Sequence, residues 1–170
     1  NAKAQVDNWY ATTIANTKYD EYVINGIFCE QAKAKISESW TSGNADMIYF
    51  KNYEPNFDCD TDGNGRGLLL NADGSRAKVG LITYDEMVHA GGYYGINNTE
   101  YYLYNGSYGI WSMSPGGFSS TAYLWMMRTQ GILIDRHVKY GYNLQPVINI
   151  KADLKAIGNG EEITPYEVLV

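Results

Sequence analysis

The sequence predicts a single α+β domain in which N-terminal helices pack on a mainly antiparallel sheet. Three observations lead to this prediction. Apolar residues recur at helical spacing near the N-terminus. Short apolar runs separated by turn residues follow in the second half, as expected for antiparallel strands. The 170 residues show neither an internal repeat nor a linker, and this length suits one domain, 1–170, with a sizeable core.

Two helices are expected at the N-terminus. The first apolar stripe has the spacing i, i+3, i+4 and i+8 and consists of Val6, Trp9, Tyr10 and Ile14. A second stripe that predicts a further helix consists of Tyr19, Tyr22, Val23 and Ile27. Residues 40–57 mix apolar residues with turn formers, so they are expected to form a loop with a short strand near 47–50.

A hairpin and a short helix are expected next. Apolar runs at 68–70 and 77–82 flank an Asp-Gly turn, which is typical of a β-hairpin. Thr83 and Glu86 have the spacing of a capping box, with apolar residues on either side of it. This pattern predicts a helix over 84–90 that ends at the following glycine.

The remaining strands are expected in the second half of the chain. Residues 92–109 are rich in Tyr, Gly and Asn and predict an irregular surface segment with one strand at 101–104. Apolar runs at 122–128 and 132–138 around a Thr-Gln-Gly turn predict another hairpin. A further strand is expected over 144–150, where Pro146 favours an edge position or a bulge.

Composition excludes several classes of protein. The hydrophobic fraction is 45% and the charged fraction 19%, which is typical of a globular chain. The net charge is −6 without a basic block, which argues against nucleic acid and anionic membrane surfaces as partners. No apolar run approaches the length of a membrane span, and no signal peptide is visible. Because the chain begins at Asn1 without a Met, we expect that upstream residues were removed.

The two cysteines, Cys29 and Cys59, lack the spacing of a redox motif, and no second pair completes a zinc site. A closed loop of this length suits a structural disulfide worth roughly 2–4 kcal/mol. A disulfide would imply an oxidising compartment, so an extracellular or cell-surface location is expected. Two buried, unpaired thiols remain the alternative.

Tyrosine is unusually frequent, with 16 Tyr and 4 Trp against only 4 Phe. Because tyrosine combines an apolar ring with a polar tip, it suits surfaces that bind ligands and also strands that are half buried. Burial is favoured for Trp111, whereas Trp125 is left open between core and binding face. The candidate ligand-binding residues are Tyr93, Tyr94, Tyr101, Tyr102, Tyr104, Tyr108 and Trp125.

An acidic loop is the candidate metal site. Carboxylates and an amide at alternate positions before glycine can wrap a calcium ion, and here they are Asp58, Asp60, Asp62 and Asn64. The closing acid of a calcium loop is absent, because the twelfth position is Leu69 or Asn71 in the two possible registers. A solvated acidic turn stabilised by Asx hydrogen bonds is the alternative.

Several segments occur in the order seen in one family, and the resemblance spans nearly the whole chain. These segments are Trp9-Tyr10, Ile27-Phe28-Cys29, Val79-Gly80-Leu81-Ile82-Thr83-Tyr84-Asp85-Glu86, Ala90-Gly91-Gly92, Asn98-Thr99-Glu100-Tyr101-Tyr102-Leu103-Tyr104-Asn105-Gly106, Trp111-Ser112-Met113-Ser114-Pro115 and Pro146-Val147-Ile148-Asn149-Ile150-Lys151. The chain resembles a group of secreted or surface-anchored domains of unknown function from gut-associated Gram-positive bacteria.

The last two of these segments also resemble the C-type-lectin-like fold, in the broad sense that includes formylglycine-generating enzymes. In that fold a Gly-Val/Phe-Arg-Pro-Val strand closes the core. Here Gln145 stands at the Arg position, which removes a charge-assisted hydrogen-bonding fork. The enzymes use a late cysteine pair, whereas this chain has no cysteine after Cys59, so the resemblance does not imply their oxidase activity.

The chain also contains the residue types of a nucleophile–base–acid set: Ser112, Ser114, His137 and Asp135. No strand–nucleophile–helix elbow surrounds either serine, so ordinary polar residues on an exposed hairpin are the favoured interpretation. His89 is expected to stabilise the end of its short helix. Two histidines without a third ligand make a weak zinc site.

The leading hypothesis is therefore a non-catalytic extracellular recognition or adhesion domain that binds a carbohydrate or protein ligand through its Tyr/Gly/Asn-rich loops. No cofactor is expected, apart from calcium as an option at the acidic loop. The alternative hypothesis is a structural subunit of a cell-surface assembly, pilin-like or filamentous, whose first helix leaves its apolar stripe unpaired. An unrecognised hydrolase is a third, less favoured hypothesis.

Overall fold

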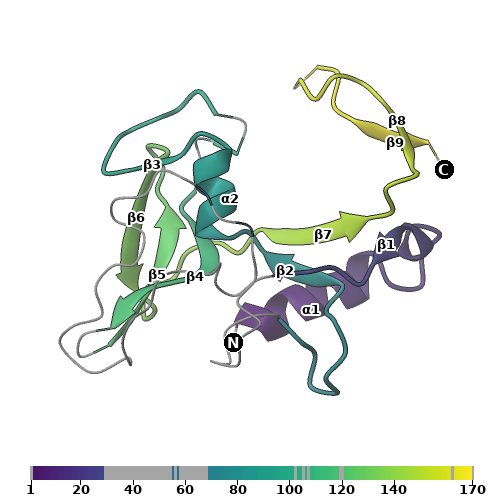
Figure 1. Cartoon of the computed structure of the whole chain (residues 1–170), viewed down its shortest axis with the longest axis horizontal. Helices are drawn as coiled ribbons and strands as arrows, with labels where there is room; N and C mark the ends of the chain where they lie inside the picture. The colour runs from purple at the N-terminus through teal and green to yellow at the C-terminus, as the bar shows by residue number, and fades with distance from the viewer. Residues whose placement is uncertain are drawn as a thin grey trace.

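The computed structural model describes residues 2–28, 55, 57, 69–101, 103–104, 106, 108–118, 121–161 and 163–169. Cys29, Cys59 and the predicted strand near 47–50 lie outside these residues. Within them the chain is α+β with mostly antiparallel pairing, which confirms the predicted class. Figure 1 shows α2 beside a larger sheet, α1 beside a smaller one, and a C-terminal hairpin that projects from both.

The N-terminal helix α1 (Ala2–Thr13) forms as predicted, and it buries Val6 and Tyr10. The predicted second helix is wrong. A single 3₁₀ turn (Asp20–Tyr22) leads directly into strand β1 (Val23–Ile24). The β-branched residues of β1 pair with a distant strand, and this long-range pairing overrides the local helical spacing.

The smaller sheet has the order β1-β7-β2, with β2 at Val79–Leu81 and β7 at Pro146–Ile150. The strand β7 confirms the predicted apolar run. The expectation of an edge position or a bulge is wrong, because β7 is central and its pairing with β1 and β2 has no register shift. Pro146 is the first residue of β7 and lies opposite Leu81, a place where a strand tolerates proline. The expected turn before β2 is present, with Gly74 N donating to Asn71 O at 3.0 Å.

The larger sheet has the order β3-β6-β5-β4. Its strands are β3 (Tyr93–Tyr94), β4 (Ile110–Phe118), β5 (Ala122–Met127) and β6 (Ile132–His137). The antiparallel β5–β6 pair confirms the second predicted hairpin, whereas β3 pairs with β6 in parallel. Pro115 lies on the edge strand β4 between two register shifts, where the ladder is already interrupted.

The predicted helix forms as α2 (Tyr84–His89), and its capping box is complete. Glu86 N donates to Thr83 Oγ1 at 3.1 Å, while Thr83 N donates to Glu86 Oε2 at 2.7 Å. Gly91 follows with a φ of +111°, so it ends the helix as predicted. His89 lies in the last turn, where a basic residue is expected.

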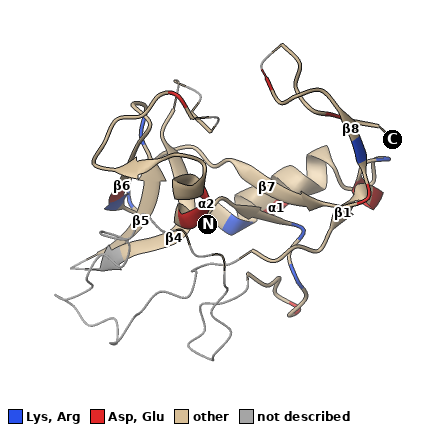
Figure 2. Cartoon of the chain, turned by 45° about the horizontal axis from the view of Figure 1, so that its top comes forward, with Lys and Arg blue, Asp and Glu red and all other residues tan. Residues whose placement is uncertain are grey.

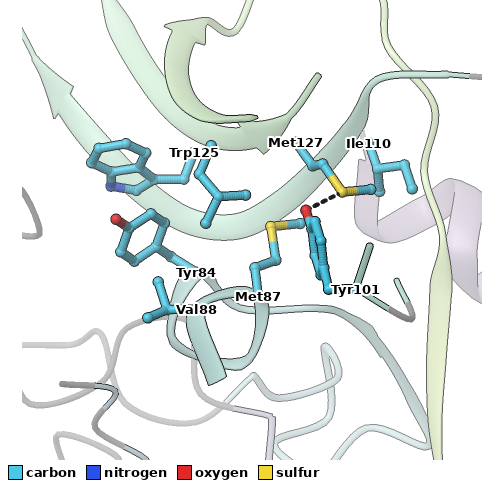
Figure 3. Close-up of a cluster of buried hydrophobic side chains, with 8 residues drawn as sticks. Tyr84, Met87, Val88, Tyr101, Ile110, Trp125 and Met127 are labelled. Atoms are coloured by element: carbon cyan, nitrogen blue, oxygen red, sulfur yellow. Dashed lines mark hydrogen bonds between the residues drawn. The ribbon is translucent and has the colours of Figure 1, made fainter. Parts of the chain in front are cut away.

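Two apolar clusters hold the domain together. The first lies between α2 and the larger sheet and contains Tyr84, Met87, Val88, Tyr101, Ile110, Trp125, Met127 and Leu133 (Figure 3). The second lies between α1 and the smaller sheet and contains Val6, Tyr10, Val23, Val79 and Leu81. Met113 of β4 packs against the second cluster, and its N–H donates to Ile82 O at 2.9 Å. Strand β4 therefore connects the two sheets.

Strands β8 (Lys155–Ile157) and β9 (Glu167–Leu169) form the C-terminal hairpin. Its apolar side chains are largely exposed, among them Ile163 and Tyr166. In Figure 1 this hairpin stands clear of the two sheets. A two-stranded hairpin without a packed face gains little stability from its own contacts.

Candidate functional site: an aromatic band along residues 137–143

The structure places two of the predicted ligand-binding residues in the core. Trp125 is 0% exposed and Tyr101 is 7% exposed. Figure 3 shows Tyr101 pointing toward Met127, and its hydroxyl also donates to Gly131 O at 3.1 Å. Neither side chain is available to a ligand at the surface, which corrects the expectation for this pair. The physical reason is that α2 has only six residues and cannot cover the larger sheet alone. Residues of the following segment, including Tyr101, pack on the same face of that sheet.

The other predicted tyrosines do not form one surface. Tyr94 and Tyr104 are partly buried against the first cluster, and burial together with the charge of Asp135 raises the pKa of Tyr94. Tyr93 and Tyr108 are exposed, but Tyr93 lies on the edge strand β3 and Tyr108 precedes β4 at the other edge. Tyr102 lies outside the described residues. Residues 101 and 104 form a turn instead of the predicted strand, with Tyr104 N donating to Tyr101 O.

The candidate metal residues Asp58, Asp60, Asp62 and Asn64 lie outside the described part of the chain, as does the Cys29–Cys59 pair. Within the part that is described, no group of His, Cys, Asp and Glu side chains has an arrangement that could hold a metal ion.

The two serines of the nucleophile hypothesis have structural partners. Ser112 Oγ donates to Trp125 O at 2.9 Å and accepts from Ser114 N at 3.1 Å. Ser114 Oγ accepts from Tyr84 N at 2.9 Å at the start of α2. Both serines are 0% exposed. They therefore join β4 to β5 and to α2, and the expectation that they lie on an exposed hairpin is wrong because both side chains are buried in this junction.

Aromatic side chains, three of them exposed and two half-buried, lie along the segment that follows β6. We define the aromatic band as His137, Tyr123, Tyr140, Tyr142 and Tyr108. Sheet register creates its first part, because Tyr123 of β5 lies opposite His137 of β6. Their ring centroids are 4.1 Å apart, and the Tyr140 ring lies 6.1 Å from the His137 ring in an edge-on arrangement.

Backbone contacts with β4 position the second part of the band. Asn143 N donates to Gly109 O and Trp111 N donates to Asn143 O, both at 3.0 Å. These bonds bring Tyr142 beside the chain at Tyr108. The Tyr142 ring packs edge-on against the buried Trp111 at 5.2 Å, which confirms the predicted burial of Trp111 and fixes the Tyr142 side chain.

The band leaves aromatic surface exposed and surrounds it with polar groups. Tyr108 is 62%, Tyr140 48% and Tyr142 37% exposed. The ammonium of Lys139 lies 5.5 Å from the centroid of the Tyr140 ring. Thr121 Oγ1 hydrogen-bonds His137 Nδ1. Figure 2 shows basic and acidic residues next to each other along β6.

A short stretch of the sequence carries a signal for this band. Residues 140–143 read Tyr-Gly-Tyr-Asn, which is the same composition that drew attention to 92–109. Because they lie between two apolar runs that predict strands, the pattern predicts a connection there and does not indicate a binding surface.

Among the described residues, none of the helices combines the length and apolar character needed to cross a membrane. Comparison of the chain with protein-family models, with curated proteins and with solved structures finds no match.

Proposed function

We propose that this chain is a non-catalytic extracellular recognition or adhesion domain that binds a carbohydrate or protein ligand through its aromatic band. The observation that carries the proposal is the exposure of Tyr140 and Tyr142, two residues apart on a segment that is hydrogen-bonded to the chain at Ala122 and at Gly109. Tyrosine supplies a large contact area at a low cost in side-chain entropy, and its hydroxyl can hydrogen-bond a polar ligand.

The way the band is held supports this proposal. The segment that carries Tyr140 and Tyr142 is fixed at one end by Val138 N, which donates to Ala122 O at 3.1 Å. At the other end it is fixed by Asn143 through the bonds to β4 described above. A binding segment that is anchored at both ends loses little conformational freedom when a ligand binds. Binding residues on a loop positioned by a sheet are a common arrangement.

Glycan arrays, followed by titration calorimetry with each glycan that binds, test whether the ligand is a carbohydrate. A pull-down from cell-surface extracts tests whether the ligand is a protein. Tyr140→Ala and Tyr142→Ala should each weaken binding at least about tenfold if these rings contribute as interface tyrosines usually do. Tyr166→Ala is the matched control, because Tyr166 is more exposed than either band tyrosine but lies on the C-terminal hairpin. Equal binding by all three variants would contradict the assignment of the band.

Gly141 offers a second, steric test. A Cβ placed at Gly141 meets no heavy atom within 4 Å, so a large side chain there should leave the fold intact. Gly141→Trp should therefore obstruct a ligand on the neighbouring tyrosines while the midpoint of thermal unfolding stays unchanged. A variant that binds as tightly as the wild type would place the ligand elsewhere.

The same proposal includes a fold family, a calcium site and a disulfide. We infer a C-type-lectin-like arrangement and membership of the surface-domain group from gut-associated Gram-positive bacteria, on the motifs quoted above. Calcium at the acidic loop is tested by thermal unfolding with added calcium and with chelator, in the wild type and in Asp60→Ala. The Cys29–Cys59 disulfide is tested by mass spectrometry of the non-reduced protein.

A structural subunit of a surface assembly remains a second candidate, and the exposed apolar side chains of the β8–β9 hairpin favour it. The pilin-like form of this candidate is disfavoured, because α1 docks its apolar residues Val6 and Tyr10 on its own sheet. Light scattering of the wild type and of Ile163→Asp, at several protein concentrations, would show whether the chain assembles through this hairpin. A concentration-dependent oligomer that the substitution dissolves would support assembly, and a monomer throughout would contradict it.

A further inference from the structure

A cavity of about 180 Å³ lies between α1, β2 and the β4–β5 pair. Figure 1 shows α1 lying alongside β2 where these elements meet. Ala2 lines the cavity and is itself exposed, so the cavity reaches solvent at the start of α1. Apolar side chains from both sheets and from α1 line it, and they are Val6, Leu69, Leu81, Met113 and Leu124.

One hydroxyl reaches the lining, that of Ser112, and it already has partners. Ser112 Oγ donates to Trp125 O at 2.9 Å and accepts from Ser114 N at 3.1 Å. These bonds hold β4 to β5, so the hydroxyl is committed to the structure of the wall.

Lys3 is the ionisable residue among the described residues that line the cavity, and its charge is also engaged. Its ammonium forms an i, i+4 ion pair with Asp7 and lies 3.4 Å from Asn71 Oδ1. The Lys3 side chain is only 23% exposed. A lysine whose head is held by polar partners covers apolar surface with its methylene stem, so Lys3 extends the apolar wall toward the mouth.

The character and the size of the cavity restrict its occupant. Apolar walls offer dispersion contacts, and a charged or strongly polar molecule inside would lose its hydrogen bonds to water. An apolar protein cavity of roughly 150 Å³ stays dry and accepts a molecule such as benzene. The cavity here is of comparable size, so a single ring fills it. Met113 makes the wall adaptable, because methionine is unbranched and polarizable.

We propose that this cavity is a binding site for a small, neutral, apolar molecule with a single ring. The molecule enters beside Ala2 and contacts Val6, Leu81 and Met113. The site is separate from the aromatic band, because Tyr123 and Leu124 are successive residues of β5 and point to opposite faces of the sheet. It is therefore a second recognition site, whichever ligand the band binds.

Three probes that share one ring and differ in charge test the proposal: toluene, benzoate and benzylamine. Titration calorimetry and the midpoint of thermal unfolding should show saturable binding of toluene. Both charged probes should bind at least about tenfold more weakly, because each would have to leave water without a new partner in the described lining.

Two substitutions separate this site from its surroundings. Lys3→Met removes the ammonium and keeps an unbranched apolar stem, so it should leave toluene binding unchanged. Tyr140→Ala should also leave toluene binding unchanged, although it should weaken the ligand of the aromatic band. Failure of the band proposal would therefore not affect the result at this cavity.

A matched pair of helix variants locates the binding. Ala2→Trp places a large ring at the mouth and should reduce toluene binding at least about tenfold, whereas Ala4→Trp should leave it unchanged. Both alanines are exposed on α1, but Ala4 is not among the lining residues, so neither change disturbs the core. Leu124→Trp fills the cavity from the sheet and should have the same effect as Ala2→Trp if the variant folds.

Several results would overturn the proposal. It fails if toluene does not bind saturably, or if its binding survives Ala2→Trp. It also fails if benzoate or benzylamine binds as tightly as toluene, because the ring would then not be enclosed by apolar walls. Loss of toluene binding in Lys3→Met would likewise contradict the role of the lysine stem.

Discussion

Replacing Tyr101 with Phe should change how the stability of this domain depends on alkaline pH. Burial raises the pKa of Tyr101 to about 12, above its ordinary value of 10.0. The unfolded chain loses this proton near pH 10, while the folded chain keeps it until the pH reaches about 12. The folded state then binds more protons than the unfolded state, so stability falls as pH rises through that window.

The structure sets the size of both effects. Below pH 10 the neutral hydroxyl donates to Gly131 O at 3.1 Å, and removing it should cost about 1–2 kcal/mol because a buried carbonyl loses its donor. One unit above the unfolded pKa, ionisation should destabilise the wild type by about 1.4 kcal/mol, a loss that Tyr101→Phe does not suffer. The stability difference between the two proteins should therefore nearly vanish at about pH 11.

Denaturant unfolding of the wild type and of Tyr101→Phe, at intervals from about pH 8 to about pH 11, measures this difference. The other tyrosines are the same in both proteins, so their contributions cancel in the difference between the two free energies of unfolding. Tyr108→Phe is the matched control, because it removes the same hydroxyl from a ring that is 62% exposed. A difference between wild type and Tyr101→Phe that stays constant over this range would refute the reasoning, since it would mean that the buried hydroxyl ionises as readily as a solvated one.

Two further predictions concern the local structure that supports the sheet. Thr83→Ala removes one half of the capping box and should lower the free energy of unfolding by about 1–2 kcal/mol, whereas Thr129→Ala in the exposed turn should change it by less than about 0.5 kcal/mol. Equal effects in denaturant titrations would mean that the cap does not hold α2. Gly131 has a φ of +71°, and a Cβ there would lie 1.6 Å from Asn98 O, so Gly131→Ala should cost more than about 2 kcal/mol. Gly141→Ala should be neutral, and a stable Gly131→Ala variant would contradict the turn geometry.

Local patterns predicted the elements whose signals are short-range. The capping box of α2, the β5–β6 hairpin with its Gly131 turn, and the first helix all form where the sequence places them. Each depends on contacts within a few residues, such as the bond from Glu86 N to Thr83 Oγ1. Periodicity and turn chemistry record such contacts directly.

Features decided by distant parts of the chain were not predicted. The stripe from Tyr19 to Ile27 has helical spacing, but Val23 and Ile24 pair with Ile150 and Asn149 at the other end of the chain. Pro146 suggested an edge strand, yet β7 became central because proline occupies only its first position. The residues around Val23 and around Pro146 do not indicate the distant strands with which they pair.

The division of tyrosines between core and surface follows from the short length of α2. A helix of six residues covers only part of a four-stranded sheet, and the segment after it supplies the rest of the cover. Tyr101 therefore packs beside Met127, although its Tyr/Gly/Asn-rich surroundings resemble a binding loop. The segment at 138–143 follows the last strand of that sheet and is anchored by backbone hydrogen bonds at both ends. Tyr140 and Tyr142 of this segment stay exposed, which is why the proposed ligand contact is assigned to it and not to Tyr101.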